Sequence, residues 1–128
     1  MATAHDVITR ALRFAGVLAS GETPASDDAA DALTALNQML AGWEMEGIRM
    51  GLPPLALTDT ITVPDAHLEG IVMGLAMVLC QEYGRQPGPV LMTRATRTRQ
   101  ALQAAYFQMP ASRGDLGYQQ YTWWGRTV

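Results

Sequence analysis

Few side chains in this sequence have the type and spacing that chemistry requires. The only two histidines, His5 and His67, each fall in the first turn of an expected helix, and no cluster of Cys, Asp or Glu surrounds either at metal-ligand spacing. Glu44 and Glu46 are two residues apart, so on a helix they point to different faces. The single cysteine, Cys80, has apolar neighbours and is expected to be a small buried side chain. We therefore expect no metal, no cofactor and no paired-carboxylate site.

Motifs of nucleophilic and phosphate chemistry are also missing from the sequence. No serine stands in a G-x-S-x-G turn. The glycine-containing turn at residues 84–89 has neither a G-x-G-x-x-G pattern nor a lysine. Acyl or glycosyl transfer needs positioned groups that this sequence does not provide, so we do not expect an enzyme.

Arginines are the remaining candidates for binding chemistry. Arg94 and Arg97 share a face of an expected helix and could contact DNA phosphates, whereas Arg99 turns away. A sequence-specific reader of DNA normally carries a basic surface, and this domain as a whole is acidic. A small helical DNA-binding regulator is therefore the alternative function, with non-specific contact to DNA in a channel as a separate case.

The last eighteen residues, 111–128, differ in character from the rest. They show no helical period, and four of the nine aromatic residues of the chain lie in the final eleven positions. Exposed Trp, Tyr and Arg dominate binding hot spots. Such an arm either packs on its own domain or docks into a partner, and its composition favours the partner. The candidate docking residues are Arg113, Tyr118, Tyr121, Trp123, Trp124 and Arg126.

Charge is distributed unevenly along the 128 residues. The chain has a net charge of −3 and no lysine; residues 1–83 hold three Arg against eleven acids, whereas residues 84–128 hold six Arg against one acid. An acidic body with a basic C-terminal part suggests association through that part. No run approaches the roughly 20 apolar residues of a membrane helix, and the charged opening residues do not read as a secretory signal. We expect one domain, without a membrane partner, assembled inside a cell.

The stretch at residues 26–48 organises the chain. Ser26 is a suitable N-cap, and Gly47 is a suitable stop because glycine adopts the left-handed conformation that ends many helices. Alternating spacings of four and three gather the apolar residues on one helix face. These residues are Ala29, Leu33, Leu36, Leu40 and Trp43.

Three further helices are expected. The first begins with a capping box of Thr3 and Asp6, with Asp in place of the usual Glu or Gln. The third is apolar nearly all round, which is typical of a central helix, and Gly70 and Gly74 would let a neighbouring helix come close. The expected ranges are residues 3–15, 65–83 and 89–109.

Residues 55–63 alternate apolar residues with threonine and predict a short strand or small hairpin. A lone hairpin is barely stable in water, so it should lie on the helices or pair with another chain. The candidate subunit-contact residues are Leu57, Thr58, Thr60, Ile61 and Val63.

The expected fold is thus mainly α: a small four-helix bundle with a short strand or hairpin insert and an extended C-terminal arm. The helical domain would span residues 1–109 and the arm residues 110–128.

Residues 11–48 resemble the N-terminal signature of a tailed-bacteriophage family, the head-to-tail adaptor, head-completion or packaged-DNA-stabilisation proteins. Residues 11–16 read ALRFAG, similar to the A-L-R-x-x-G of the family, and residues 36–43 read LNQMLAGW, similar to its L-N-x-M-L-x-x-W. An acid and Gly47-Ile48 follow, as in the family. The order of elements also fits, through about residue 109.

This resemblance implies a structural virion protein that forms a ring, commonly a dodecamer, beneath the portal in the neck of the virion. Its C-terminal segment would bind the portal protein, and its lower surface would meet a tail or tail-nozzle protein. The ring would be assembled in the host cytoplasm, extend the DNA channel, help to retain packaged DNA and dock the tail. A channel lined with acids repels DNA phosphate and would let the genome slide.

Overall fold

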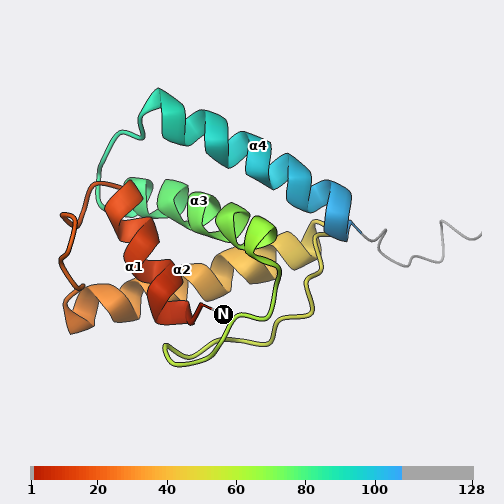
Figure 1. Cartoon of the computed structure of the whole chain (residues 1–128), viewed down its shortest axis with the longest axis horizontal. Coiled ribbons are helices and arrows are strands. Elements are labelled where there is room, and N and C mark those ends of the chain that lie inside the picture. The colour runs from red at the N-terminus through yellow and green to blue at the C-terminus, as the bar shows by residue number, and fades with distance from the viewer. Residues whose placement is uncertain (1, 108–128) are drawn as a thin grey trace, which may run out of the picture.

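Four helices make up most of the computed structural model, which describes residues 2–107 (Figure 1). Helix α3 is central: it packs against each of the other three helices, whereas α4 packs mainly on α3. Figure 1 shows α4 running along one side of α3, while α1 crosses both α2 and α3. The prediction of a mainly α, four-helix fold is confirmed. The helices are α1 (Ala4–Phe14), α2 (Ser26–Met45), α3 (Asp65–Glu82) and α4 (Pro89–Tyr106).

Helix α3 is buried along most of its length, as its nearly continuous apolar sequence predicts. Ile71, Leu75 and Leu79 are fully buried and form the middle of a single core to which all four helices contribute. Cys80 is buried beside them, and desolvation raises the pKa of its thiol. Within residues 2–107, no helix combines the length and the apolar character needed to cross a membrane.

Each of the two glycines of α3 leaves room for a side chain of a different neighbouring helix. A Cβ at Gly74 would lie 2.8 Å from Cζ2 and 3.0 Å from Cη2 of Trp43 on α2. A Cβ at Gly70 would lie 2.6 Å from Cδ1 of Leu102 on α4. The close approach that the four-residue spacing predicted is confirmed, with one neighbouring helix at each glycine.

Helix α4 ends at Tyr106, three residues short of the predicted residue 109, because Phe107 takes an extended conformation with a ψ of 126°. The other helix ends follow the sequence signals with one exception. In the capping box of α1, the amide of Thr3 donates to the Asp6 carboxylate and the amide of Asp6 donates to the Thr3 hydroxyl. The pKa of Asp6 is lowered, mainly by the hydrogen bond from the Thr3 amide and next by the Thr3 side chain. At the end of α2, Gly47 has a φ of 99°, and the amide of Ile48 donates to the Trp43 carbonyl at 2.9 Å. The exception is Ser26, which is the first residue of α2 rather than its cap, because Ala25 takes the capping position without a side-chain bond.

The strand or hairpin predicted for residues 55–63 does not form. This segment contains a turn and a single antiparallel bridge between Thr60 and Thr3. The backbone groups that a hairpin would pair internally are used elsewhere: the carbonyls of Asp59 and Leu57 accept from the amides of Ala4 and His5 at 2.9 and 3.0 Å. These two amides belong to the first turn of α1, where helix donors have no partner within the helix. The segment therefore caps α1 from the outside.

The acidic start of α2 is bound to the end of α3. The hydroxyl of Tyr83 donates to Oδ1 of Asp28 at 2.9 Å. Burial of the phenol, followed by this hydrogen bond and the nearby negative charges, raises the pKa of Tyr83 to about 12. The contact therefore fixes the α2 start against the far end of the central helix.

The close contact at Gly74 predicts opposite effects for two matched substitutions. Gly42→Ala on α2 meets nothing within 4 Å, so its higher helix propensity should stabilise the fold by about 0.5–1 kcal/mol. Gly74→Ala gains the same propensity but overpacks against the buried ring of Trp43, which costs roughly 1–3 kcal/mol. Urea denaturation should place Gly74→Ala below Gly42→Ala by that amount. Equal stability of the two variants would contradict the close approach.

Candidate functional site

The end of α4 is held beside the end of α2, and this junction, from which the predicted C-terminal arm would start, is called the root. Ile48 and Phe107 form an antiparallel bridge, and the amide of Arg49 donates to the carbonyl of Tyr106 at 3.3 Å. The Tyr106 hydroxyl also lies 2.7 Å from Nδ1 of His67, with the two rings edge to face at 4.9 Å. His67, which was expected in the first turn of a helix, lies in the first turn of α3 and is half-buried in this contact.

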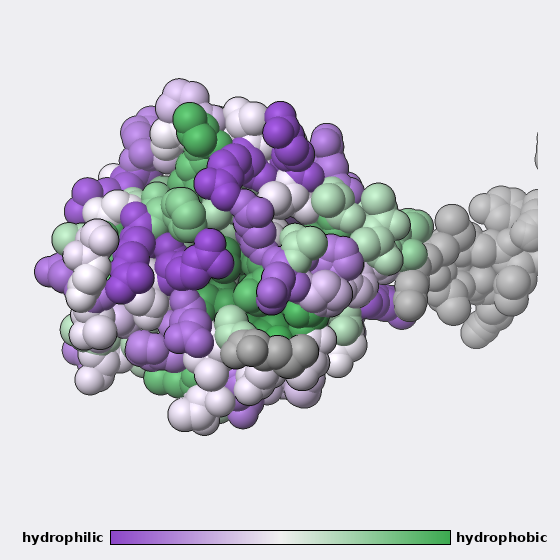
Figure 2. All heavy atoms as spheres, in the orientation of Figure 1, coloured by the Kyte–Doolittle hydropathy of each residue, from purple (hydrophilic) through white to green (hydrophobic). Residues whose placement is uncertain are grey.

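The predicted docking residues of the arm lie outside the described residues, so their role stays a prediction. These are Arg113, Tyr118, Tyr121, Trp123, Trp124 and Arg126. What the structure provides is the surface around the root. Phe107 is 53% exposed, and Figure 2 shows pale green, apolar surface at the end of α4 next to the grey residues.

A groove lies beside the root, between the outer face of α2 and residues 48–54. It has a volume of about 410 Å³, within the range of about 300–1,000 Å³ that is usual for ligand pockets. Its lining is mostly apolar, and Met45, one of the lining residues, is 84% exposed. The principal apolar residues are Leu40, Met45, Ile48, Met50, Leu52 and Pro53.

Sequence reasoning missed this groove. Met45 lies off the apolar stripe of α2, and residues 53–54 were assigned no role from the sequence. A methionine outside the stripe, followed closely by Met50 and two prolines, was the available signal. Methionine adapts its shape readily and is over-used on surfaces that bind varied partners.

Two of the three arginines on α4 are already paired within the domain. Arg94 forms an ion pair with Glu69 of α3, and Arg99 forms one with Glu46 near the end of α2. The Arg99 guanidinium also lies 5.8 Å from the ring centre of Trp43. The prediction that Arg99 turns away from Arg94 is consistent with these separate partners.

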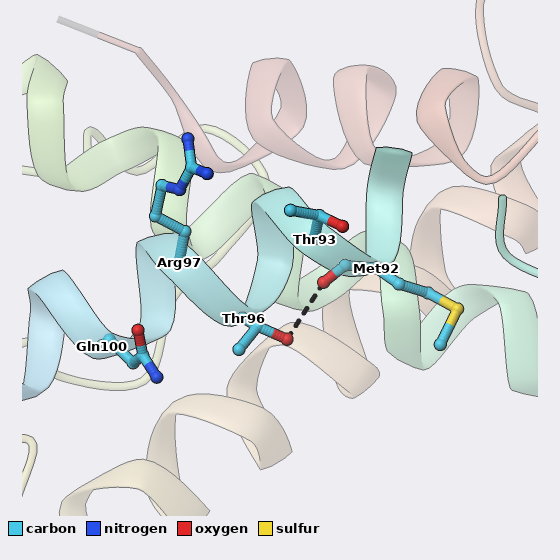
Figure 3. Close-up of a pocket in the computed structure, with 5 residues that line it drawn as sticks. All are labelled: Met92, Thr93, Thr96, Arg97 and Gln100. Carbon is cyan, nitrogen blue, oxygen red and sulfur yellow. Dashed lines mark hydrogen bonds between the residues drawn. The ribbon is translucent and has the colours of Figure 1, made fainter. Parts of the chain in front are cut away.

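Arg97 lies on the outward face of α4, in the shallow depression drawn in Figure 3. Among residues 2–107 it has no carboxylate within ion-pair distance. The other residues there are Met92, Thr93, Thr96 and Gln100, and the Thr96 hydroxyl donates to the Met92 carbonyl at 3.0 Å. Since all five residues come from one helix, the depression is helix surface rather than an enclosed site.

A cluster of basic and aromatic side chains joins α1 to α4. The guanidinium carbons of Arg10 and Arg94 lie 5.9 and 5.5 Å from the ring centre of Phe14, which is 41% exposed. Arg13 lines the same surface depression as Arg10 and Phe14. This cluster was not predicted, because Arg10 and Arg94 are 84 positions apart in sequence.

Residues 36–43 hold the domain together. Leu36 is fully buried, and Trp43 packs on Gly74. Asn37 accepts from the amide of Leu55 at 2.8 Å and donates to the carbonyl of the same residue at 3.0 Å. This amide side chain therefore pairs with the loop as a strand backbone would, and it ties residues 50–63 to α2.

The predicted subunit-contact residues are divided by the structure. Ile61 and Val63 are buried in the core of their own chain, and Leu57 is half-buried. Thr58 and Thr60 remain exposed. Of the five predicted residues, the two threonines are therefore the most accessible to a second subunit.

The sequence was compared with family models and with curated proteins; no family model and no curated protein matches it. Within residues 2–107, no group of three or more His, Cys, Asp or Glu side chains is placed to hold a metal ion.

Removing the Asn37 side chain should destabilise the fold. Asn37→Ala leaves the amide and carbonyl of Leu55 without these bonds, and an unsatisfied buried group costs about 1–3 kcal/mol. Gln38→Ala, at an exposed neighbour on the same helix, should stay within about 0.5 kcal/mol of the wild type. Urea denaturation measures both, and hydrogen exchange at the Leu55 amide should accelerate only in Asn37→Ala. Indistinguishable variants would show that the two bonds do not matter.

Proposed function

We propose that this chain is a structural protein of a tailed-bacteriophage virion, a head-to-tail adaptor that forms a ring beneath the portal. In this role it has no catalytic task. The ring extends the DNA channel, helps to retain packaged DNA and offers the tail machinery a docking surface. The proposal is supported by the resemblance of residues 11–48 to the signature of that family.

One observation supports the proposal: residues 2–107 build a hydrophobic core among themselves. Core residues run from Ala4 to Leu102, and the central helix is covered by the other three. We propose that the aromatic residues 118–124 lie outside this core and serve a partner instead. Aromatic residues and arginine that a core does not need are suited to anchoring a partner.

Assembly into a ring needs two different patches on each subunit, because a head-to-tail contact joins unlike surfaces. Exposed Thr58 and Thr60 offer one surface. The outward side of α4 offers another, since Val90 is 71% and Met92 is 48% exposed and the helix contains no acidic residue.

A second candidate, a DNA-binding regulator, is favoured by the cluster around Phe14. Arg10 and Arg13 on α1 add to Arg97 on α4 as basic side chains that could contact phosphate. Against it, Arg94 is paired with Glu69, and the acids of the chain outnumber its basic residues. The candidate therefore depends on few available charges.

Deleting residues 111–128 should leave the helical fold intact and abolish binding to the cognate portal protein. Far-UV circular dichroism checks the fold, and mass measurement of the mixture checks the complex. Trp123→Ala and Trp124→Ala should each weaken binding by about 2 kcal/mol or more, because buried aromatic anchors dominate interfaces. Arg126→Ala should cost less than about 1 kcal/mol, as exposed charges do. Full binding by the truncated chain would refute the assignment of the arm.

The regulator candidate predicts binding to duplex DNA with a steep salt dependence. Arg97→Ala should then reduce the slope of log affinity against log salt by about 1. Arg49→Ala is the matched control, because Arg49 is also exposed but lies at the root, away from Arg97 and the cluster around Phe14. Fluorescence anisotropy at low salt makes the measurement. No binding at low salt would exclude this candidate.

A further inference from the structure

We infer that the groove between α2 and residues 48–54 is a docking site for the aromatic segment, residues 118–124, of the same chain. The inference goes beyond the proposed function, because it concerns the free subunit and does not require a portal. It rests on where the arm begins, on the shape and lining of the groove, and on the charge of the two parts.

The described part of the chain ends beside the groove. Ile48 lines the groove and also forms the bridge to Phe107, the last described residue. From Phe107 to Tyr118 the chain has eleven residues, which span at most about 36–40 Å when fully extended. Helix α2 has 20 residues and is therefore about 30 Å long. The aromatic segment can thus reach any point of the groove without any change in the described helices.

The groove suits an aromatic side chain. Its volume of about 410 Å³ and its methionine, leucine and proline lining provide an adaptable apolar surface. Met45, at 84% exposed, is the most exposed of the large apolar residues of the described chain, and it stands at this groove. Tryptophan buries more apolar surface than any other side chain, so Trp123 and Trp124 have the most to gain there.

Charge favours the same pairing. Glu44 is exposed and is the one charged residue among those lining the groove. Residues 108–128 carry Arg113 and Arg126 against Asp115 alone. The acid at the groove therefore attracts an arm of net positive charge. Because the intervening residues tether the arm to the domain, its local concentration at the groove is in the millimolar range typical of short linkers.

An arm docked in the groove would bury Trp123 and Trp124, the side chains that are proposed to bind the portal. On the proposed function, the portal would have to displace the segment from the groove before binding it. Free subunits would then keep their tryptophans away from one another until a portal is present.

The test follows the tryptophans in the full-length chain by ¹⁹F NMR after incorporation of 5-fluorotryptophan. The chain has three tryptophans, and Trp123→Phe and Trp124→Phe assign the two in the arm. A synthetic peptide of residues 111–128 gives the reference shifts of the undocked segment. We expect at least one arm resonance of the full chain to differ from the peptide.

Two arginine substitutions on α2 form a matched pair. Ala41 is exposed and lines the groove, whereas Ala30 is exposed on the same helix eleven residues earlier, about three turns away on the same face. Ala41→Arg adds bulk and positive charge to the groove and should return the arm resonances to the peptide positions. Ala30→Arg should leave them unchanged. The Trp43 resonance monitors the fold and should move in neither variant.

Each other outcome overturns the inference in a distinct way. Arm resonances at the peptide positions in the wild type show that no docking occurs. Displaced resonances that Ala41→Arg does not move place the segment elsewhere. Resonances that return toward the peptide positions on tenfold dilution assign the groove to the arm of a second copy. All of these results leave portal binding untested, so they are distinct from a failure of the proposed function.

Discussion

The fold depends on how closely α2 approaches α3, and this distance is set by the ring of Trp43 against Gly74. The ring occupies the space that a Cβ at position 74 would need, and it is 5% exposed. One turn away, Gly70 makes the same accommodation for Leu102 of α4. Because the two glycines lie on one helix and admit different neighbours, α3 serves as the common surface for the fold.

The second constraint is the attachment of residues 50–63, which have no regular structure of their own. Asn37 binds both backbone groups of Leu55, and the first turn of α1 donates to the carbonyls of Leu57 and Asp59. Ile61 and Val63 then enter the core. The loop thus satisfies helix donors and supplies core side chains at the same time, and it also forms one wall of the groove.

Local signals predicted the helices well because they depend on neighbours in sequence. The apolar spacing of α2, the capping box at Thr3 and the stop at Gly47 all act within a few residues. The strand at residues 55–63 was wrong, although its alternation was real, since the hydrogen-bond partners that decide its conformation come from α1 and Asn37. Propensity for a strand is a weak guide when distant groups compete for the backbone.

The candidate surfaces were less predictable for the same reason. The pairing of Arg94 with Glu69, and the meeting of Arg10 with Phe14 and Arg94, join separate helices. The groove likewise needs α2 and a loop together. The aromatic residues 118–124 stand out by composition alone, without any fold, and their role as a docking arm stays a prediction.

The bridge between Ile48 and Phe107 has a mechanical consequence. A pulling force on the chain beyond residue 107 meets this bridge and the hydrogen bond from Arg49 to Tyr106 before it can peel α4 away from α3. The force is then shared between the ends of two helices. It reaches α2 through the hydrogen bond from the Ile48 amide to the Trp43 carbonyl. A domain anchored in this way transmits tension applied beyond residue 107 into α2 as well as α4.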